Sequence, residues 1–179
     1  LKGVVSFDDQ PPQIQMPVPE TEWTEVGYPD DDVVIYHGPI FRHLTEFTGK
    51  EETSEAWGRL TAPEPAEVAG RRSPEGWTVP CAVLDGCFFT CGLGLWVVFG
   101  GVVAIPQGID RMQFFRMPHP GEKCTMYLHY RGRVGVISTC GFTTFGEDGS
   151  VVLAVDGYRN VVVAEDTVYA PEILNQEQS

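Results

Sequence analysis

The feature that most constrains this chain is an uncharged, apolar run at residues 87–105, which follows a single carboxylate, Asp85. A run of this length without a charge has to be buried, either in protein or in lipid. It is long enough to span a membrane, but several glycines interrupt it and no cluster of Lys or Arg flanks it. The stronger interpretation is a core helix over residues 86–99, apolar on all sides because other structure covers it.

Asp85 stands directly before that predicted helix, and two interpretations of it stay open. Backbone N–H groups at a helix N-terminus favour the ionised carboxylate, whereas apolar neighbours disfavour it. A plain helix cap explains the residue as well as a catalytic acid does. A nucleotide-binding loop at residues 92–94 is disfavoured, because the third glycine of the dinucleotide fingerprint and the Walker lysine are both missing.

The composition excludes several classes of function. The chain has 179 residues and a formal net charge of −13, which argues against binding nucleic acid or an anionic membrane surface. Its five cysteines form no C-x-x-C pair and no zinc spacing, so we expect reduced thiols, no structural metal and no cofactor. A signal-peptide pattern is missing, which predicts a cytoplasmic protein. Leu1 is not an initiator methionine, so we expect a segment of a longer protein.

Proline and acidic residues divide the chain into three parts. Residues 1–32 have the composition of an extended linker, residues 33–164 carry the apolar patterns of a domain, and residues 165–179 are a polar tail. Before the helix we expect strands at 33–36 and 56–60, the second with Trp57 pointing inward. The run 40–47 is too short to distinguish helix from strand. Residues 62–79 are expected to form a mobile loop beside Asp85.

After the helix the apolar residues alternate with a period of two, which is typical of strands. The expected strands cover residues 109–116, 124–131, 134–145 and 151–163, and the short turns between them make the sheet antiparallel. One apolar helix and such a sheet bury their surfaces most economically when the sheet curls around the helix. The predicted fold is therefore α+β, a hotdog with an antiparallel sheet wrapped around a long central helix.

Four motifs resemble, in the same order, segments of polyketide synthase dehydratase domains. Residues 36–42 read YHGPIFR and resemble the family's "YGPxF" segment, and residues 84–86 read LDG and resemble its "LLDxxxQ" helix start. Residues 105–111 read IPQGIDR and resemble its "lPxgi" strand, and residues 149–161 resemble its closing strand. The "HGPxF" and "LDG" forms are most similar to iterative, enediyne-type and polyunsaturated-fatty-acid synthases.

The resemblance implies a double hotdog that removes water from a β-hydroxyacyl thioester held on an acyl carrier protein. In this family the first half supplies a His base from an "HxxxGxxxxP" motif and the second half supplies the Asp. That His motif is missing here, so the chain resembles the C-terminal half, with Asp85 as the acid. Its partner would be the preceding hotdog half or a homodimer mate. The residues implied to bind substrate are Tyr36, His37, Gly38, Pro39, Phe41, Gly86, Phe89 and Tyr158.

The chain also departs from the family pattern near Asp85. Phe89 stands where the family has a Gln or His one turn after the Asp, and Pro80-Cys81 replaces the usual "HP". A phenyl ring cannot orient a carboxyl by hydrogen bonding. Two alternatives therefore stay open: a catalytically silent pseudo-dehydratase that holds neighbouring domains in place, and a stand-alone hotdog acyl thioesterase.

Overall fold

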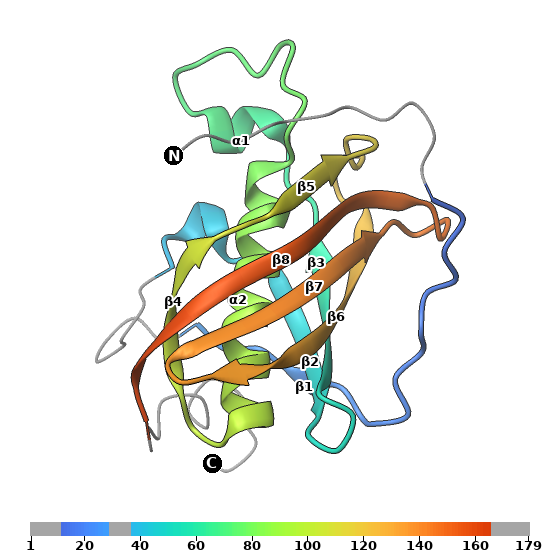
Figure 1. Ribbon diagram of the computed structural model, residues 1–179. Helices are drawn as coiled ribbons and strands as arrows, with labels where there is room; N and C mark the ends of the chain where they lie inside the picture. Colours follow the sequence, from blue (N-terminus) through green and yellow to red (C-terminus); the bar gives the residue numbers. More distant parts are fainter. Residues whose placement is uncertain (1–11, 29–36, 166–179) are drawn as a thin grey trace, which may run out of the picture.

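A curved sheet and one long helix dominate the computed structural model, which describes residues 12–28 and 37–165 (Figure 1). In this part of the chain all the strands belong to one antiparallel sheet, which wraps around helix α2 (Cys81–Phe99). The inward side chains of the sheet and the helix form a single hydrophobic core. The predicted hotdog architecture is therefore confirmed.

The sheet follows the chain closely, because most neighbouring strands are also neighbours in sequence. Among the described residues its order is β1-β2-β3-β6-β7-β8-β4, and β5 also pairs with β8. The bounds before the central helix are β1 (Thr24–Glu25), the 3₁₀ turn η1 (Pro39–Phe41), β2 (Leu44–Lys50), β3 (Glu55–Thr61) and α1 (Pro65–Ala69). The bounds after it are β4 (Val103–Gly108), β5 (Arg111–Phe114), β6 (Lys123–Val134), β7 (Ile137–Phe145) and β8 (Val151–Ala164).

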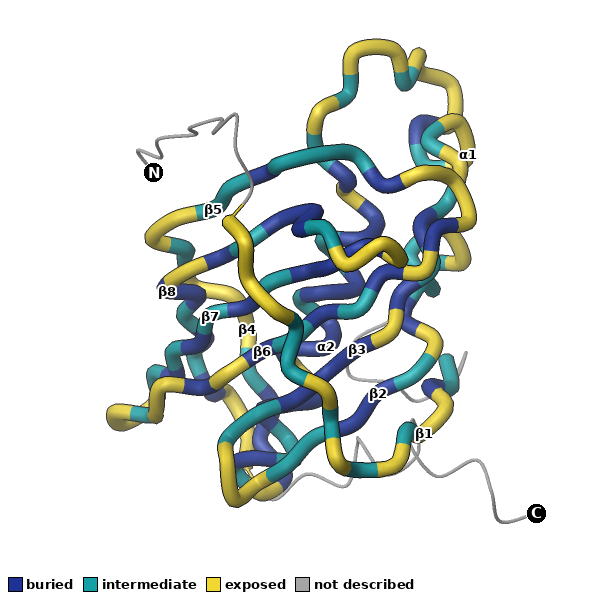
Figure 2. Tube along the Cα trace, turned by 90° about the vertical axis from the view of Figure 1, so that its right-hand side faces the viewer, coloured by how far each residue is buried: buried dark blue, intermediate teal, exposed yellow. Residues whose placement is uncertain are grey.

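The strands predicted after the helix are present, with one difference. The expected strand 109–116 is the shorter strand β5, and a further strand, β4, precedes it, separated by a break at Ile109 and Asp110. At the break, the Asp110 carboxylate lies against Gly157, whose positive φ of 64° favours glycine. Along β6, buried positions alternate with more exposed ones, as Figure 2 shows. The period-two pattern therefore predicted β5 to β8, whereas β4 was implied only by the resemblance of residues 105–111 to a family strand.

Helix α2 is longer than the sequence analysis predicted. It begins at Cys81 and not at Gly86, and Pro80 is its N-cap residue. Val83 is buried in the same core and Leu84 packs against it, so the helix extends back as far as the proline. By length and composition α2 could cross a membrane, but most of it is buried against the sheet. It is the core helix that the apolar run predicted.

Strand β3 packs on α2 with one face, and a single residue of its other face, Trp57, is buried as well. Ala56, Gly58 and Leu60 face α2, and a Cβ atom added at Gly58 would lie 2.4 Å from Thr90 Oγ1 of the helix. Trp57 therefore points to the opposite, outer face. There its ring packs on Tyr127, with 5.4 Å between ring centroids. The prediction that Trp57 points inward is wrong, although the side chain is buried as expected.

A segment at residues 12–28 runs along the outer face of the sheet, as Figure 2 shows. It contacts Trp57 there through Pro17. The Trp57 indole N–H donates to the Pro17 carbonyl at 2.9 Å, and the Thr21 and Thr48 hydroxyls are 2.7 Å apart. The segment then forms β1, which pairs with β2, and buries Val26. The described part of the predicted linker thus lies along the sheet. The predicted strand 33–36 lies outside the described residues.

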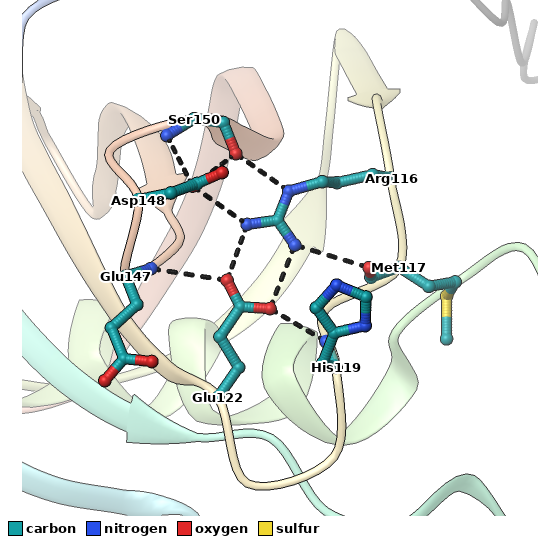
Figure 3. A network of polar contacts seen from close by, with 7 residues as sticks. All are labelled: Arg116, Met117, His119, Glu122, Glu147, Asp148 and Ser150. Carbon is teal, nitrogen blue, oxygen red and sulfur yellow. Dashed lines mark hydrogen bonds and ion pairs between the residues drawn. The ribbon is translucent and has the colours of Figure 1, made fainter.

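An ionic network joins the connection between β5 and β6 to the turn between β7 and β8 (Figure 3). The Glu122 carboxylate accepts from both terminal nitrogens of Arg116, at 2.9 and 2.5 Å. It also accepts from the backbone N–H groups of His119, at 2.7 Å, and Glu147, at 3.3 Å. Arg116 Nε donates to Ser150 Oγ at 2.8 Å. These bonds lower the pKa of Glu122 to about 2.

Candidate functional site

Asp85 lies on α2, just over one turn beyond the first helical residue, Cys81. The N-cap position belongs to Pro80, and no side chain caps the helix. The interpretation of Asp85 as a plain helix cap is therefore wrong. The favourable effect of the helix N-terminus on an anion falls off within the first turn. The helix therefore positions Asp85, but its N-terminus contributes little to stabilising the Asp85 anion.

Burial determines the electrostatics of Asp85. The residue is half-buried, and its Oδ2 atom is inaccessible and has no hydrogen-bond partner in the part of the chain that the structure describes. Burial raises the pKa of Asp85 above its ordinary value, while the nearby His37 and His43 side chains lower it in part. Of the two opposing effects left open by the sequence, desolvation is therefore the stronger. A carboxyl in this environment is suited to hold a proton.

An aromatic cluster lies beside Asp85, one turn along the helix. The rings of His37 and Phe89 are 4.2 Å apart between centroids, and Tyr28 contacts both, at 5.9 and 5.7 Å. The Tyr28 hydroxyl donates to the Leu44 carbonyl and accepts from the Leu44 N–H. Phe89 is 8% exposed, so it acts as the apolar floor of this cluster. Of the predicted site residues, the structure brings His37 and Phe89 together beside Asp85.

The turn after His37 fixes its position. Phe41 N–H donates to the Gly38 carbonyl at 2.8 Å, which closes η1 with Pro39 at its first position. The Arg42 side chain then donates to the His37 carbonyl at 2.9 Å. Gly38, Pro39 and Phe41 therefore shape the turn that presents His37. Tyr36 lies outside the described residues.

Two further predicted substrate-binding residues have clear packing roles. Gly86 lies where a Cβ atom would be 2.3 Å from Leu60 Cδ2, so its missing side chain lets β3 approach the helix. Tyr158 on β8 is 2% exposed and packs on Phe88, with ring centroids 4.9 Å apart. Burial raises the pKa of Tyr158. Contact of either residue with a substrate stays a prediction.

Sequence reasoning missed two neighbours of this site. Tyr28 falls in the stretch whose composition predicts a linker, and no local pattern marks it as part of a core. His43 lies on the far side of η1, where its Nε2 atom is 2.7 Å from the Ile40 carbonyl oxygen. The sequence gives only a weak signal for His43: it follows Phe41 closely, so His37 and His43 lie at the two ends of one turn and could reach the same site.

A narrow apolar slot adjoins the start of α2. Its walls come from the connection between β3 and α2, which includes Trp77 and Val79, from Val83 on the helix and from Met117. The sequence predicted that residues 62–79 form a mobile lip beside Asp85. In the structure this connection contains helix α1 and borders the slot, which Asp85 does not line.

The cysteines show no features of a nucleophile or a metal site. Cys87, Cys91, Cys124 and Cys140 are buried, and burial raises the pKa of the Cys87 thiol to about 12. Cys87 Sγ lies 3.2 Å from Thr144 Oγ1. Within residues 12–28 and 37–165, His, Cys, Asp and Glu side chains form no group that could hold a metal ion.

Several solved structures share this fold. The dehydratase domain from the CurJ module of the curacin polyketide synthase is 16% identical, with a TM-score of 0.57, over 72% of this chain and 44% of that one. The RzxB dehydratase domain from Pseudomonas fluorescens is 13% identical, with a TM-score of 0.56, over 70% and 42%. GphF dehydratase 1 is 20% identical, with a TM-score of 0.52, over 72% and 46%. The chain thus spans less than half of each of these structures.

A family model gives the sequence-level match. A search of curated proteins finds no match to the chain. The family model described as polyketide synthase dehydratase N-terminal domain matches residues 8–168, which include the whole sheet, α2 and Asp85. Because this match covers most of the chain, the chain belongs to the polyketide synthase dehydratase family.

Proposed function

We propose that this chain is one half of a dehydratase in which Asp85 donates the proton that lets a β-hydroxyl group leave as water. A base takes the α-proton of the thioester, the electrons of that C–H bond form the C=C bond, and the C–O bond breaks as Asp85 protonates the oxygen. One observation carries the proposal. Asp85 has a buried oxygen without a partner among the described residues, and its pKa is raised.

The base in this proposal is a histidine outside the chain. No histidine of this sequence stands in an "HxxxGxxxxP" context, and the chain spans about half of the length of its structural relatives. The description of the matching family model names an N-terminal domain. We assign the chain to the C-terminal half because the acidic residue lies on its central helix. The substrate, by this proposal, is an acyl thioester carried on an acyl carrier protein.

The test uses a protein that contains both hotdog halves and a β-hydroxyacyl thioester, with the absorbance of the enoyl product as readout. Asp85→Asn should lower kcat by about 10²-fold or more, because the amide cannot donate an acidic proton. Asp156→Asn is the matched control, since Asp156 is an exposed carboxylate that pairs with Arg131. An undiminished rate in Asp85→Asn would contradict the proposal.

Phe89 favours a second candidate, a silent module that holds neighbouring domains in place. Its ring, packed on His37 and Tyr28, occupies the position where the family pattern has a Gln or His. Under this candidate the wild-type protein with both halves would form no enoyl product. The same assay therefore separates the two candidates, and release of free thiol would identify a thioesterase instead.

A further inference from the structure

His37 is the histidine whose ring lies on the same side of α2 as Asp85. Residues four apart on a helix are neighbours on one face, and helical side chains lean back toward the N-terminus. The side chain of Phe89 therefore extends toward Asp85. Because the His37 ring is stacked on Phe89 at 4.2 Å, this geometry puts an imidazole next to the carboxyl group.

The backbone and its neighbours hold His37 in that place. Arg42 Nε donates to the His37 carbonyl at 2.9 Å, and the edge of the Tyr28 ring contacts the imidazole. The Arg42 guanidinium lies 5.7 Å from the centre of the Tyr28 ring. An imidazole fixed by a backbone anchor and two rings loses little further freedom when it acts on a neighbour.

We propose that His37 is a positioning residue for Asp85, which orients the carboxyl group and adjusts its acidity. In the family pattern a Gln or His on the helix could do this, but Phe89 stands at that position here. This proposal rests on the proposed function, because it assumes that Asp85 is the proton donor. His37 would keep the carboxyl directed toward the substrate hydroxyl. It would also offset part of the penalty that burial places on the ionised form, so that Asp85 can release its proton.

The charged and titratable groups around Asp85 are consistent with this role. Among the described residues they are His37, His43, Tyr28 and Cys87, and Arg42 lies beside Tyr28. His43 is bound to the Ile40 carbonyl, and the Tyr28 hydroxyl is engaged with Leu44. Of the two imidazoles, His37 lowers the pKa of Asp85 more than His43 does. A positive His37 favours the Asp85 anion, and its removal should therefore raise the pKa of Asp85.

The first test needs no catalysis. Carbon NMR titration of the Asp85 carboxyl in the isolated chain should show a higher pKa in His37→Phe than in wild type. The phenyl ring preserves the stacking on Phe89, so the fold is retained while the charge is lost. His37→Gln, which removes the ring, should shift the pKa in the same direction, and His43→Gln should shift it less. Equal Asp85 pKa values in wild type and His37→Phe would overturn the proposal.

The second test measures kcat/KM against pH in the protein with both halves. Dehydration stops when Asp85 loses its proton, so the alkaline limb reports the pKa of Asp85. In His37→Phe this limb should move to higher pH, with KM within about twofold of wild type. An unshifted limb would overturn the role of His37. A wild-type protein without activity would instead contradict the proposed function, and the NMR titration would still decide the role of His37.

Discussion

Asp85 and Glu122 are two carboxyl groups in low-exposure sites whose pKa values move in opposite directions. Glu122 has a guanidinium and two backbone N–H groups around it, and these favour its ionised form. Asp85 has an inaccessible oxygen that no described group bonds, so burial favours its protonated form. The partners, and not burial alone, therefore separate a carboxylate that holds the fold from a carboxyl suited to chemistry.

Glu122→Gln should destabilise the fold at pH 7 by about 1.5–3 kcal/mol, since it removes charge-assisted bonds from a buried site. The pKa of Glu122 is lowered from 4.5 to about 2. Its stabilising contribution is therefore complete above the unfolded pKa and is lost as pH falls through the folded one. Urea unfolding at a series of pH values should show that, below about pH 5, the free energy of unfolding depends less on pH in the variant than in wild type.

Glu147→Gln is the matched control, because the Glu147 side chain is exposed and only its backbone N–H joins the network. The free energy of unfolding of this variant should lie within about 0.5 kcal/mol of the wild-type value. Equal stability of Glu122→Gln and wild type at pH 7 would show that the network does not hold the two loops together.

At this scale the sequence singled out Asp85 but not most of its surroundings. Asp85 was recognisable because it is an isolated charge next to a long apolar run. Tyr28 and His43 could not be found in this way, because they reach the site through the folding of distant segments. His37 was identified by the family motif, while its stacking on Phe89 depends on the path of the turn at η1.

The contact between α2 and the sheet depends on small residues at the closest points. Gly58 of β3 faces Thr90, and Gly86 and Gly94 of α2 face Leu60 and Ala56. A glycine in the middle of a helix costs about 0.5–1 kcal/mol relative to alanine. Here close packing of the helix on β3 offsets this cost. The same packing places Asp85 at the edge of the core.

Gly58→Ala should destabilise the fold by about 1–3 kcal/mol, as expected of overpacking. The added methyl group would lie 2.4 Å from Thr90 Oγ1 and 2.8 Å from Leu44 Cδ1, so the helix or the strand must shift. Thermal unfolding followed by circular dichroism measures the change.

Gly92→Ala is the contrasting variant. Gly92 lies on α2 and is exposed, and a Cβ atom added there would meet no other atom within 4 Å. It should gain about 0.5–1 kcal/mol from helix propensity. If both alanine variants raise the unfolding temperature, close approach at Gly58 is not a determinant of the fold.

Strands and helices were predicted correctly where the pattern of apolar residues alone determines them. Alternation marked β6, β7 and β8, and the apolar run marked α2. The start of α2 was misplaced because Asp85 is a good cap residue, whereas the structure uses Pro80. Trp57 was assigned to the wrong face because a large aromatic side chain favours the core. Its own face of β3 also carries the polar residues Glu55 and Arg59, and Trp57 is buried there by the segment at residues 12–28.

At the scale of the whole molecule, the open edge of strand β4 is the surface that favours association. In the described part of the chain β4 pairs with β8 alone, and its other edge is open. Ile105 on β4 and Val163 on β8 are 50% and 55% exposed. An open edge with apolar neighbours favours pairing with another strand. Since the chain spans about half of the length of its structural relatives, we expect this edge to meet a second hotdog.

Ile105→Lys should weaken self-association of the isolated chain by about tenfold or more, because a charge would enter an apolar contact. Sedimentation velocity over a range of concentrations measures the dissociation constant. Val18→Lys is the control, since Val18 is 78% exposed and lies in the segment on the outer face. A wild-type chain that stays monomeric at every concentration would contradict this expectation.

The segment at residues 12–28 changes how the borders of the domain are drawn. It shields the indole of Trp57 with the Pro17 carbonyl, which accepts from the indole N–H, and it adds Val26 and Tyr28 to the core. These few contacts form no periodic apolar pattern, so the sequence of the segment does not reveal that it belongs to the fold. A fragment that starts at residue 33, where composition alone would divide the chain, would expose Trp57 to solvent on the outer face and would also lose Tyr28 from the aromatic cluster beside Asp85.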